Sequence, residues 1–78
     1  MPHFYLNVRT HGGLIEDPEG QECADLADAR DQAIAAAREI MSERIWRGKS
    51  PDHSQIEIMD DANHLVLVVR FQDAMPTD

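Results

Sequence analysis

Residues 25–47 read DLADARDQAIAAAREIMSERIWR, and this stretch decides the fold. At about 100° per residue, its apolar side chains gather along one stripe, and most of its charged side chains lie on the opposite side. The pattern predicts an amphipathic helix that lies on a flat apolar surface. The stripe consists of Leu26, Ala29, Ala33, Ala37 and Ile40, with Ile34, Ala36 and Met41 on its shoulders.

Both ends of this helix are marked in the sequence. We expect Asp25 to cap the first turn by accepting a backbone N–H, and Asp28 to place its charge at the positive end of the helix dipole. Gly48 can take the left-handed conformation that ends a helix, and Pro51 prevents the helix from resuming. Such a helix spans about 33 Å, whereas a seven-residue strand spans about 23 Å, so the last turns are expected to extend beyond a sheet.

The segments on either side of the helix predict strands. Residues 3–9 alternate apolar and polar side chains, as a half-buried strand does, and residues 14–15 follow a His-Gly-Gly turn as a short return strand. Residues 55–60 and 65–71 form the clearest hairpin, in which Asn63 is best suited to the positive φ of the turn.

These elements predict a single α+β domain over residues 1–74. Its order is β-β-α-β-β, with one long helix packed on one face of a three- to four-stranded antiparallel sheet. Residues 75–78 are expected to form a flexible tail.

The last predicted strand is apolar on both faces. One set of its side chains is expected beneath the helix: Leu65, Leu67, Val69 and Phe71, together with Ile56 and Ile58 of the neighbouring strand. Val66 and Val68 point to the other face, which no second helix covers. Either this face carries a shallow apolar patch, or the chain forms a homodimer through this face or through a sheet edge. The possible dimer face consists of Tyr5, Met59, Val66 and Val68.

A second candidate contact site lies at the end of the helix. Arg44 interrupts the apolar stripe, and Trp46 falls on its polar side. Because Trp and Arg are enriched in binding hot spots, the possible partner contacts are Arg44, Trp46, Arg47 and Lys49. Alternatively, the helix bends or the following loop folds back and buries Trp46 within the chain, and we prefer this second interpretation.

Composition excludes several classes of protein. The 78 residues suffice for one domain with a small core, and the single cysteine rules out an internal disulfide. We expect a cytoplasmic protein without a signal peptide or membrane span, because the longest apolar run, residues 65–69, is short. The net charge of −8 argues against general nucleic-acid binding, although residues 32–51 alone carry +2.

The sequence predicts no catalytic residue, cofactor or metal ligand. Four histidines lie near strand ends and turns without the spacing of a metal motif: His3, His11, His53 and His64. A site built in space from His3, His11 and a carboxylate stays open. Cys23 lies next to acidic residues that disfavour a reactive thiolate. The acidic residues 16–22 lack the ligand pattern of a calcium-binding loop and are expected to be solvated.

Several short motifs carry a resemblance to a known family. They are residues 1–6 (MPHFYL), Val8-Arg9, Gly12-Gly13, Asp17, Gly20, Asp25-Leu26, Ala29, Ala33 and residues 71–74 (FQDA). Through them the chain resembles a family of short, uncharacterised alphaproteobacterial proteins with a domain of unknown function. The resemblance implies a strand-strand-helix-strand-strand unit with no known activity. Asn63 and His64 depart from the glycine that such sequences usually have at this turn.

We therefore expect a small non-enzymatic protein-interaction domain that forms a homodimer and needs no cofactor. The alternative is an antitoxin-type regulatory module that masks a basic partner protein, since a small acidic domain complements such a partner. This alternative rests on analogy between folds. An enzyme ranks third, because no nucleophile, base and orienting group occur together.

Overall fold

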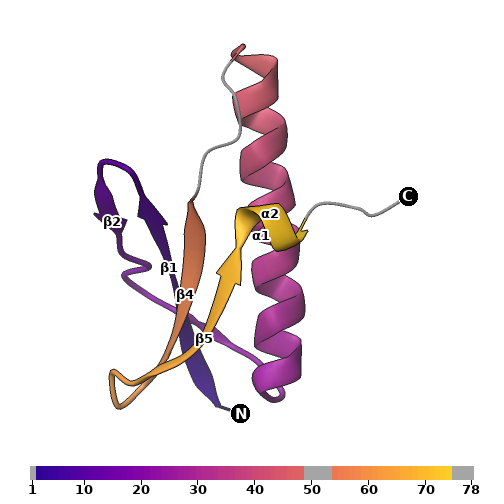
Figure 1. The fold of residues 1–78 in the computed structure, drawn as a ribbon. Helices are drawn as coiled ribbons and strands as arrows, with labels where there is room; N and C mark the ends of the chain where they lie inside the picture. The colour runs from indigo at the N-terminus through magenta and orange to yellow at the C-terminus, as the bar shows by residue number, and fades with distance from the viewer. Residues whose placement is uncertain (1, 49–53, 75–78) are drawn as a thin grey trace.

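The computed structural model describes residues 2–48 and 54–74. They form the strands β1 (His3–Thr10), β2 (Gly13–Ile15) and β3 (Gln21–Glu22), the helix α1 (Leu26–Trp46), the strands β4 (Gln55–Asp60) and β5 (Leu65–Arg70), and the short helix α2 (Phe71–Ala74). The strands make one antiparallel sheet of order β2-β1-β4-β5, with β3 also paired to β1. α1 lies along one face of this sheet (Figure 1). The predicted α+β class is confirmed.

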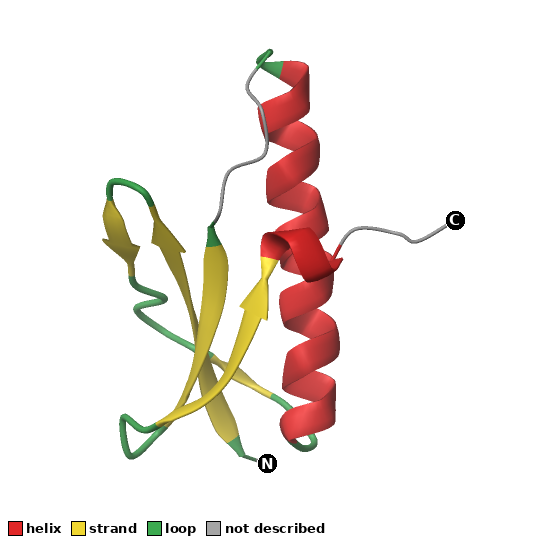
Figure 2. Ribbon diagram, in the orientation of Figure 1, coloured by secondary structure: helices red, strands yellow, loops and turns green. Residues whose placement is uncertain are grey.

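The sheet has five strands, where three or four were predicted. The additional strand is β3, just before the helix, which pairs with His3 and Phe4 of β1. β2 pairs with residues 8–10 further along the same strand. Because β4 occupies the other edge of β1, β2 and β3 form one edge strand that the loop between them interrupts (Figure 2).

The predicted ends of the long helix are confirmed. The Asp28 N–H donates to Asp25 Oδ1 at 2.8 Å, and Asp28 Oδ2 accepts the Ala24 N–H at 2.9 Å. The first bond satisfies a backbone donor that the first turn leaves without a helical partner, and the second satisfies the N–H of the residue before the cap. At the other end, Gly48 has a φ of 75° and terminates the helix. The C-terminal turns of α1 extend past the ends of β4 and β5, as predicted from the element lengths (Figure 1).

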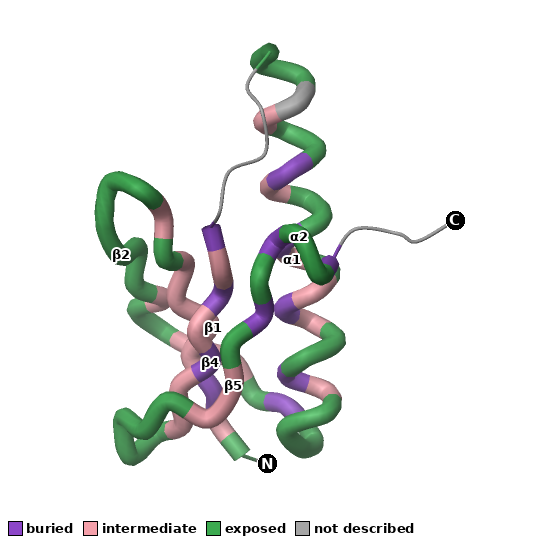
Figure 3. The backbone as a smooth tube through the Cα atoms, viewed as in Figure 1, coloured by how far each residue is buried: buried purple, intermediate pink, exposed green. Residues whose placement is uncertain are grey.

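The core lies between α1 and the face of the sheet that it covers, which we call the inner face (Figure 3). Ala29, Ala33 and Ala37 recur every fourth residue and are completely buried. Their small side chains let the helix approach the strands closely. Leu26, expected on the same stripe, is instead 38% exposed as the first residue of α1. Most of the larger buried side chains come from the strands and α2, and α1 adds Met41; those of the strands and α2 are Phe4, Ile56, Ile58, Val69 and Phe71.

The chain after β5 differs from the prediction. Residue 71 was expected to end the last strand, but residues 71–74 form the short helix α2. The Phe71 N–H donates to Ser54 O at 3.0 Å, and Arg38 Nε donates to Ala74 O at 2.6 Å. These bonds and the buried Phe71 ring fix α2 against α1. The predicted tail over residues 75–78 lies outside the described residues.

Candidate functional site

The face of the sheet opposite α1, here called the outer face, is organised in rows of paired residues. Partners in an antiparallel sheet point to the same face, so the register assigns each row. The pocket row contains Tyr5, Met59 and Leu65; the middle row contains Asn7, Glu57 and Val68; the arginine row contains Arg9, Gln55 and Arg70.

A β-bulge changes which side chains of β5 reach this face. Leu67 pairs with Ile58, but Leu65 pairs with Met59, so Val66 is the extra residue between them. Val66 is half-buried and packs against the core, whereas Leu65 is exposed. The prediction that Leu65 lies under the helix and Val66 on the opposite face is therefore wrong. The bulge interrupts the strict alternation on which that prediction depended.

The outer face is partly apolar. Leu65 and Val68 are 53% and 39% exposed, and they lie in rows that also contain the half-buried Tyr5 and Met59. The structure thus brings together three of the four residues predicted for a dimer face: Tyr5, Met59 and Val68. Their role in a dimer stays a prediction.

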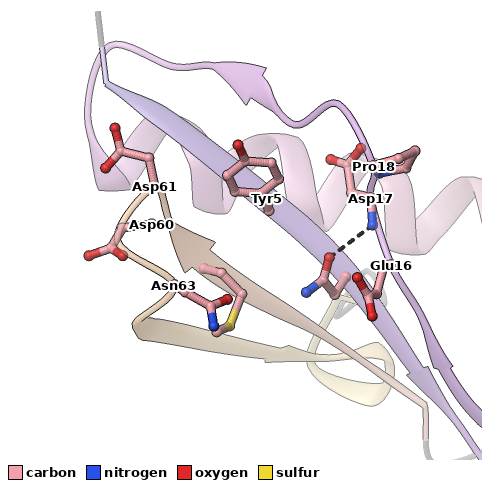
Figure 4. A pocket seen from close by; sticks show the side chains of 9 residues that line it. Tyr5, Glu16, Asp17, Pro18, Asp60, Asp61 and Asn63 are labelled. Atoms are coloured by element: carbon pink, nitrogen blue, oxygen red, sulfur yellow. Dashed lines mark hydrogen bonds between the residues drawn. The ribbon is translucent and has the colours of Figure 1, made fainter.

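A shallow pocket of about 290 Å³ opens at the pocket-row end of the outer face (Figure 4). The ring of Tyr5 lies between two acidic segments that come from different parts of the chain. One is the loop after β2, and the other is the turn after β4. The lining residues are Tyr5, Asn7, Glu16, Asp17, Pro18, Met59, Asp60, Asp61 and Asn63.

Asp17 builds one wall of the pocket. Its backbone N–H donates to Asn7 Oδ1 at 2.9 Å, and its Oδ2 accepts the Leu6 N–H of β1 at 3.3 Å. Its Oδ1 accepts the Gly20 N–H at 3.2 Å. Asp17 therefore replaces the missing strand partner where the edge is interrupted between β2 and β3. The expectation of a fully solvated acidic loop is wrong for this half-buried residue.

Asp60 builds the opposite wall. Its Oδ1 accepts the N–H groups of His64 at 2.8 Å and Ala62 at 3.0 Å. These bonds, the one from His64 above all, hold the pKa of the Asp60 carboxyl below its usual value. Asn63 has a φ of 65°, which confirms its predicted place in the turn. The turn thereby places the exposed carboxylate of Asp61 beside the pocket.

The arginine row lies at the other end of the outer face. Arg9 donates from Nε to Glu57 Oε2 at 3.0 Å and from Nη2 to Oε1 at 3.3 Å. The bond to Arg9 lowers the pKa of Glu57, and the same bond raises that of Arg9. Arg70 donates from Nε to Asp73 Oδ2 at 3.0 Å. The two arginines of the outer face thus lie at the end opposite the acidic pocket, and each is bonded to one carboxylate.

The residues of the second predicted contact site, at the end of α1, differ in their exposure. Trp46 is 87% exposed, so the preferred interpretation that the chain buries it is wrong. Arg44 is half-buried instead: its Nη1 donates to Ser54 Oγ at 3.2 Å, and its guanidinium lies 5.4 Å from the centre of the Phe71 ring. Arg47 is exposed, and its Nη2 lies 4.0 Å from Glu43 Oε1. Lys49 lies outside the described residues.

The other candidate groups are dispersed. His3 Nε2 is 2.7 Å from Glu19 O, and His64 Nδ1 is 3.5 Å from Asp60 Oδ2. Cys23 is buried, which raises the pKa of its thiol, and its Sγ accepts a bond from Gln32 at 3.6 Å. Among the described residues, no three His, Cys, Asp or Glu side chains are arranged to hold a metal ion. Within residues 2–48 and 54–74, no helix is long and apolar enough to cross a membrane.

Sequence reasoning missed the acidic pocket. Residues 16–17 and 60–61 are separated by more than half of the chain, and only the pairing of β1 with both β2 and β4 brings them together. The sequence offered one usable signal, since residues 16–17 directly follow a predicted strand and residues 60–61 lie at the end of another. Two strands that flank a third place their ends beside it.

Comparison with known proteins identifies the family. The family model described as Domain of unknown function (DUF6894) matches residues 3–72, which include the whole sheet, α1 and the pocket. No curated protein and no solved structure shows a significant match. The expected resemblance to a family with a domain of unknown function is thereby confirmed. The chain belongs to the DUF6894 family, a domain of unknown function.

Proposed function

We propose that this chain is a non-enzymatic protein-interaction domain that works as a homodimer joined through the outer face. One observation carries the proposal: α1 covers the inner face of the sheet, whereas Leu65 and Val68 on the outer face remain exposed. An antiparallel sheet with apolar side chains on both faces is stabilised when a second layer covers each face.

The size of the chain supports the same proposal. A domain of 78 residues buries only about 60% or slightly more of the surface that its unfolded chain exposes. Removing apolar surface from water contributes about 25 cal/mol per Å². Two outer faces stacked as sheets, about 10 Å apart, would cover Leu65 and Val68 without any change in the backbone.

The proposal assigns no catalytic residue and no cofactor, and it places the protein in the cytoplasm. Cys23 is the only thiol in the sequence, and its burial and raised pKa disfavour the reactive thiolate. The pocket brings together carboxylates, a phenol and amides in an open site, where no side chain is held as a nucleophile beside a base.

The acidic pocket favours a second candidate function. In this alternative, the chain is an antitoxin-type regulatory module, and the carboxylates around Tyr5 receive a basic segment of another protein. Purification from native cells distinguishes the two proposals. A stoichiometric basic partner, released at high salt, supports the alternative, whereas a homodimer without such a partner contradicts it.

The homodimer is tested with two matched substitutions of exposed apolar residues. Val68→Glu places a charge on the outer face, and Leu26→Glu places one on α1, where the native side chain is equally exposed, at 38% against 39%. We expect Val68→Glu to reduce the molar mass in solution from twice 8.8 kDa to 8.8 kDa, and Leu26→Glu to leave the dimer intact. Circular dichroism is the check that both variants are folded. A folded Val68→Glu variant that remains dimeric contradicts the proposal.

A further inference from the structure

The geometry points to one particular arrangement of this dimer: the two outer faces meet with their strands reversed, and Arg9 of each copy enters the acidic pocket of the other. This inference rests on the proposed function and adds the register of the interface and the residues that determine it. The starting point is that the acidic pocket and the two arginines lie at opposite ends of the outer face. The pocket, which contains four carboxylates, lies at one end of this face, and Arg9 and Arg70 lie at the other end.

The pocket row and the arginine row are separated along the strands. Tyr5 and Arg9 belong to the same strand and point to the same face, four residues apart. At about 3.4 Å per residue, their Cα atoms are about 14 Å apart. The middle row, with Asn7 and Val68, lies halfway between them.

Two copies can stack face to face about a two-fold axis in two simple ways. An axis parallel to the strands places each pocket row on its equivalent in the other copy, so eight carboxylates would converge. An axis across the strands places the arginine row of each copy over the pocket row of the other. Only the second arrangement brings opposite charges together, and it does so twice.

Strand order selects Arg9 from the two arginines of this row. An axis across the strands lays β1 of one copy over β1 of the other, so Arg9 faces Tyr5. Arg70 lies on β5 and faces Leu65 at the margin of the pocket row. The residue opposite the pocket is therefore Arg9.

Arg9 is already positioned for this contact in the single chain. Glu57, whose side chain is only 14% exposed, holds the guanidinium over the outer face through two bonds, while the Arg9 side chain remains 50% exposed. Those bonds use two of the five N–H donors of a guanidinium. In the pocket, the carboxylates of Glu16 and Asp61 can accept hydrogen bonds from the remaining donors. The guanidinium can also stack on the ring of Tyr5.

Charge reversal tests this register. We expect Arg9→Glu and Asp61→Arg each to weaken the homodimer, raising the dissociation constant about tenfold or more. Equimolar mixing of the two variants should restore the dimer. In the mixed dimer, the glutamate introduced by Arg9→Glu in one copy meets the arginine introduced by Asp61→Arg in the other, and the second contact retains the native Arg9 and Asp61. The dissociation constants are measured by sedimentation equilibrium.

Two matched controls on α1 carry the same changes of charge. Arg30→Glu and Asp31→Arg alter exposed residues outside the outer face and should leave the dissociation constant unchanged. Recovery on mixing separates an interface effect from a folding defect, because two misfolded variants do not restore each other.

The outcomes distinguish this inference from the proposed function. Suppose that Val68→Glu dissociates the wild-type dimer, whereas Arg9→Glu and Asp61→Arg leave its dissociation constant unchanged. This result overturns the register and retains the outer-face dimer. Failure of the two weakened variants to recover on mixing also overturns the register. A wild-type monomer at every concentration overturns both, and capture of a basic partner would then identify another occupant of the pocket.

Discussion

The guanidinium of Arg9 binds both carboxylate oxygens of Glu57, at 3.0 Å and 3.3 Å. The two residues are diagonal neighbours, because Arg9 pairs with Gln55 and Glu57 pairs with Asn7. The contact therefore joins β1 to β4 in addition to the backbone ladder. It also fixes an arginine on the outer face of the sheet, opposite α1.

Glu57→Gln tests the contribution of this contact to stability through its pH dependence. The bond to Arg9 lowers the folded-state pKa of Glu57 below the ordinary value of 4.5. A lowered pKa contributes stability that is fully present above the unfolded-state value and lost as the pH falls through the folded-state value. We expect wild type to unfold at higher urea than Glu57→Gln at neutral pH, and the difference to shrink below pH 4.5.

Urea midpoints of both proteins, measured from neutral to acid pH, check this expectation. Glu39→Gln, which removes an exposed carboxylate from α1, is the control and should show no comparable change. A difference between Glu57→Gln and wild type that grows in acid contradicts the assignment.

Ala33→Leu tests the close contact between α1 and the sheet. Ala33 is completely buried, so a larger side chain must displace the strands beneath it. Overpacking of this kind lowers the free energy of unfolding by about 1–3 kcal/mol. Ala35→Leu, on the exposed side of the same helix, should change it by less than about 0.5 kcal/mol. Equal effects of the two substitutions in urea unfolding would show that the stripe is not buried.

Asn63→Ala tests the turn between β4 and β5. A side chain without a local hydrogen-bonding group tolerates the φ of 65° poorly, and we expect a loss of about 1 kcal/mol in the free energy of unfolding. Asn63→Gly should retain wild-type stability or exceed it, because glycine takes positive φ without strain. The opposite ranking of the two variants in thermal unfolding would show that the turn has another conformation.

Trp46 provides a direct optical test of the end of α1. It is the single tryptophan of the sequence and is 87% exposed, so its fluorescence reports one site. We expect its emission to resemble that of hydrated indole in the folded protein and to change little on unfolding in urea. Trp46→Phe should leave stability within about 0.5 kcal/mol of wild type. A shift to longer wavelength on unfolding would contradict the exposed position.

The sequence predicted those parts of the fold that depend on local chemistry. Asp25 and Gly48 mark the ends of α1, Asn63 marks the turn of the hairpin, and the alternation of residues 3–9 identifies β1. Each of these signals acts within a few residues of the backbone group that it satisfies. Such interactions are visible in a single sequence.

The errors arise where distant contacts override a local pattern. Phe71 continues the alternation of β5, but its N–H bonds to Ser54 and its ring is buried beside α1, so α2 begins there. Val66 is displaced by a bulge that pairing with β4 creates. In the sequence, Asp17 resembles a solvated loop residue, because its bond from the Leu6 N–H depends on the position of β1. The acidic pocket depends on such contacts, and the sequence therefore did not predict it.

In the proposed homodimer, a second copy of the chain covers the outer face. The most direct test is the molar mass of the wild-type protein in solution, measured by sedimentation equilibrium over a wide dilution series. We expect a mass that rises with concentration toward twice 8.8 kDa. A mass of 8.8 kDa at every concentration would contradict it.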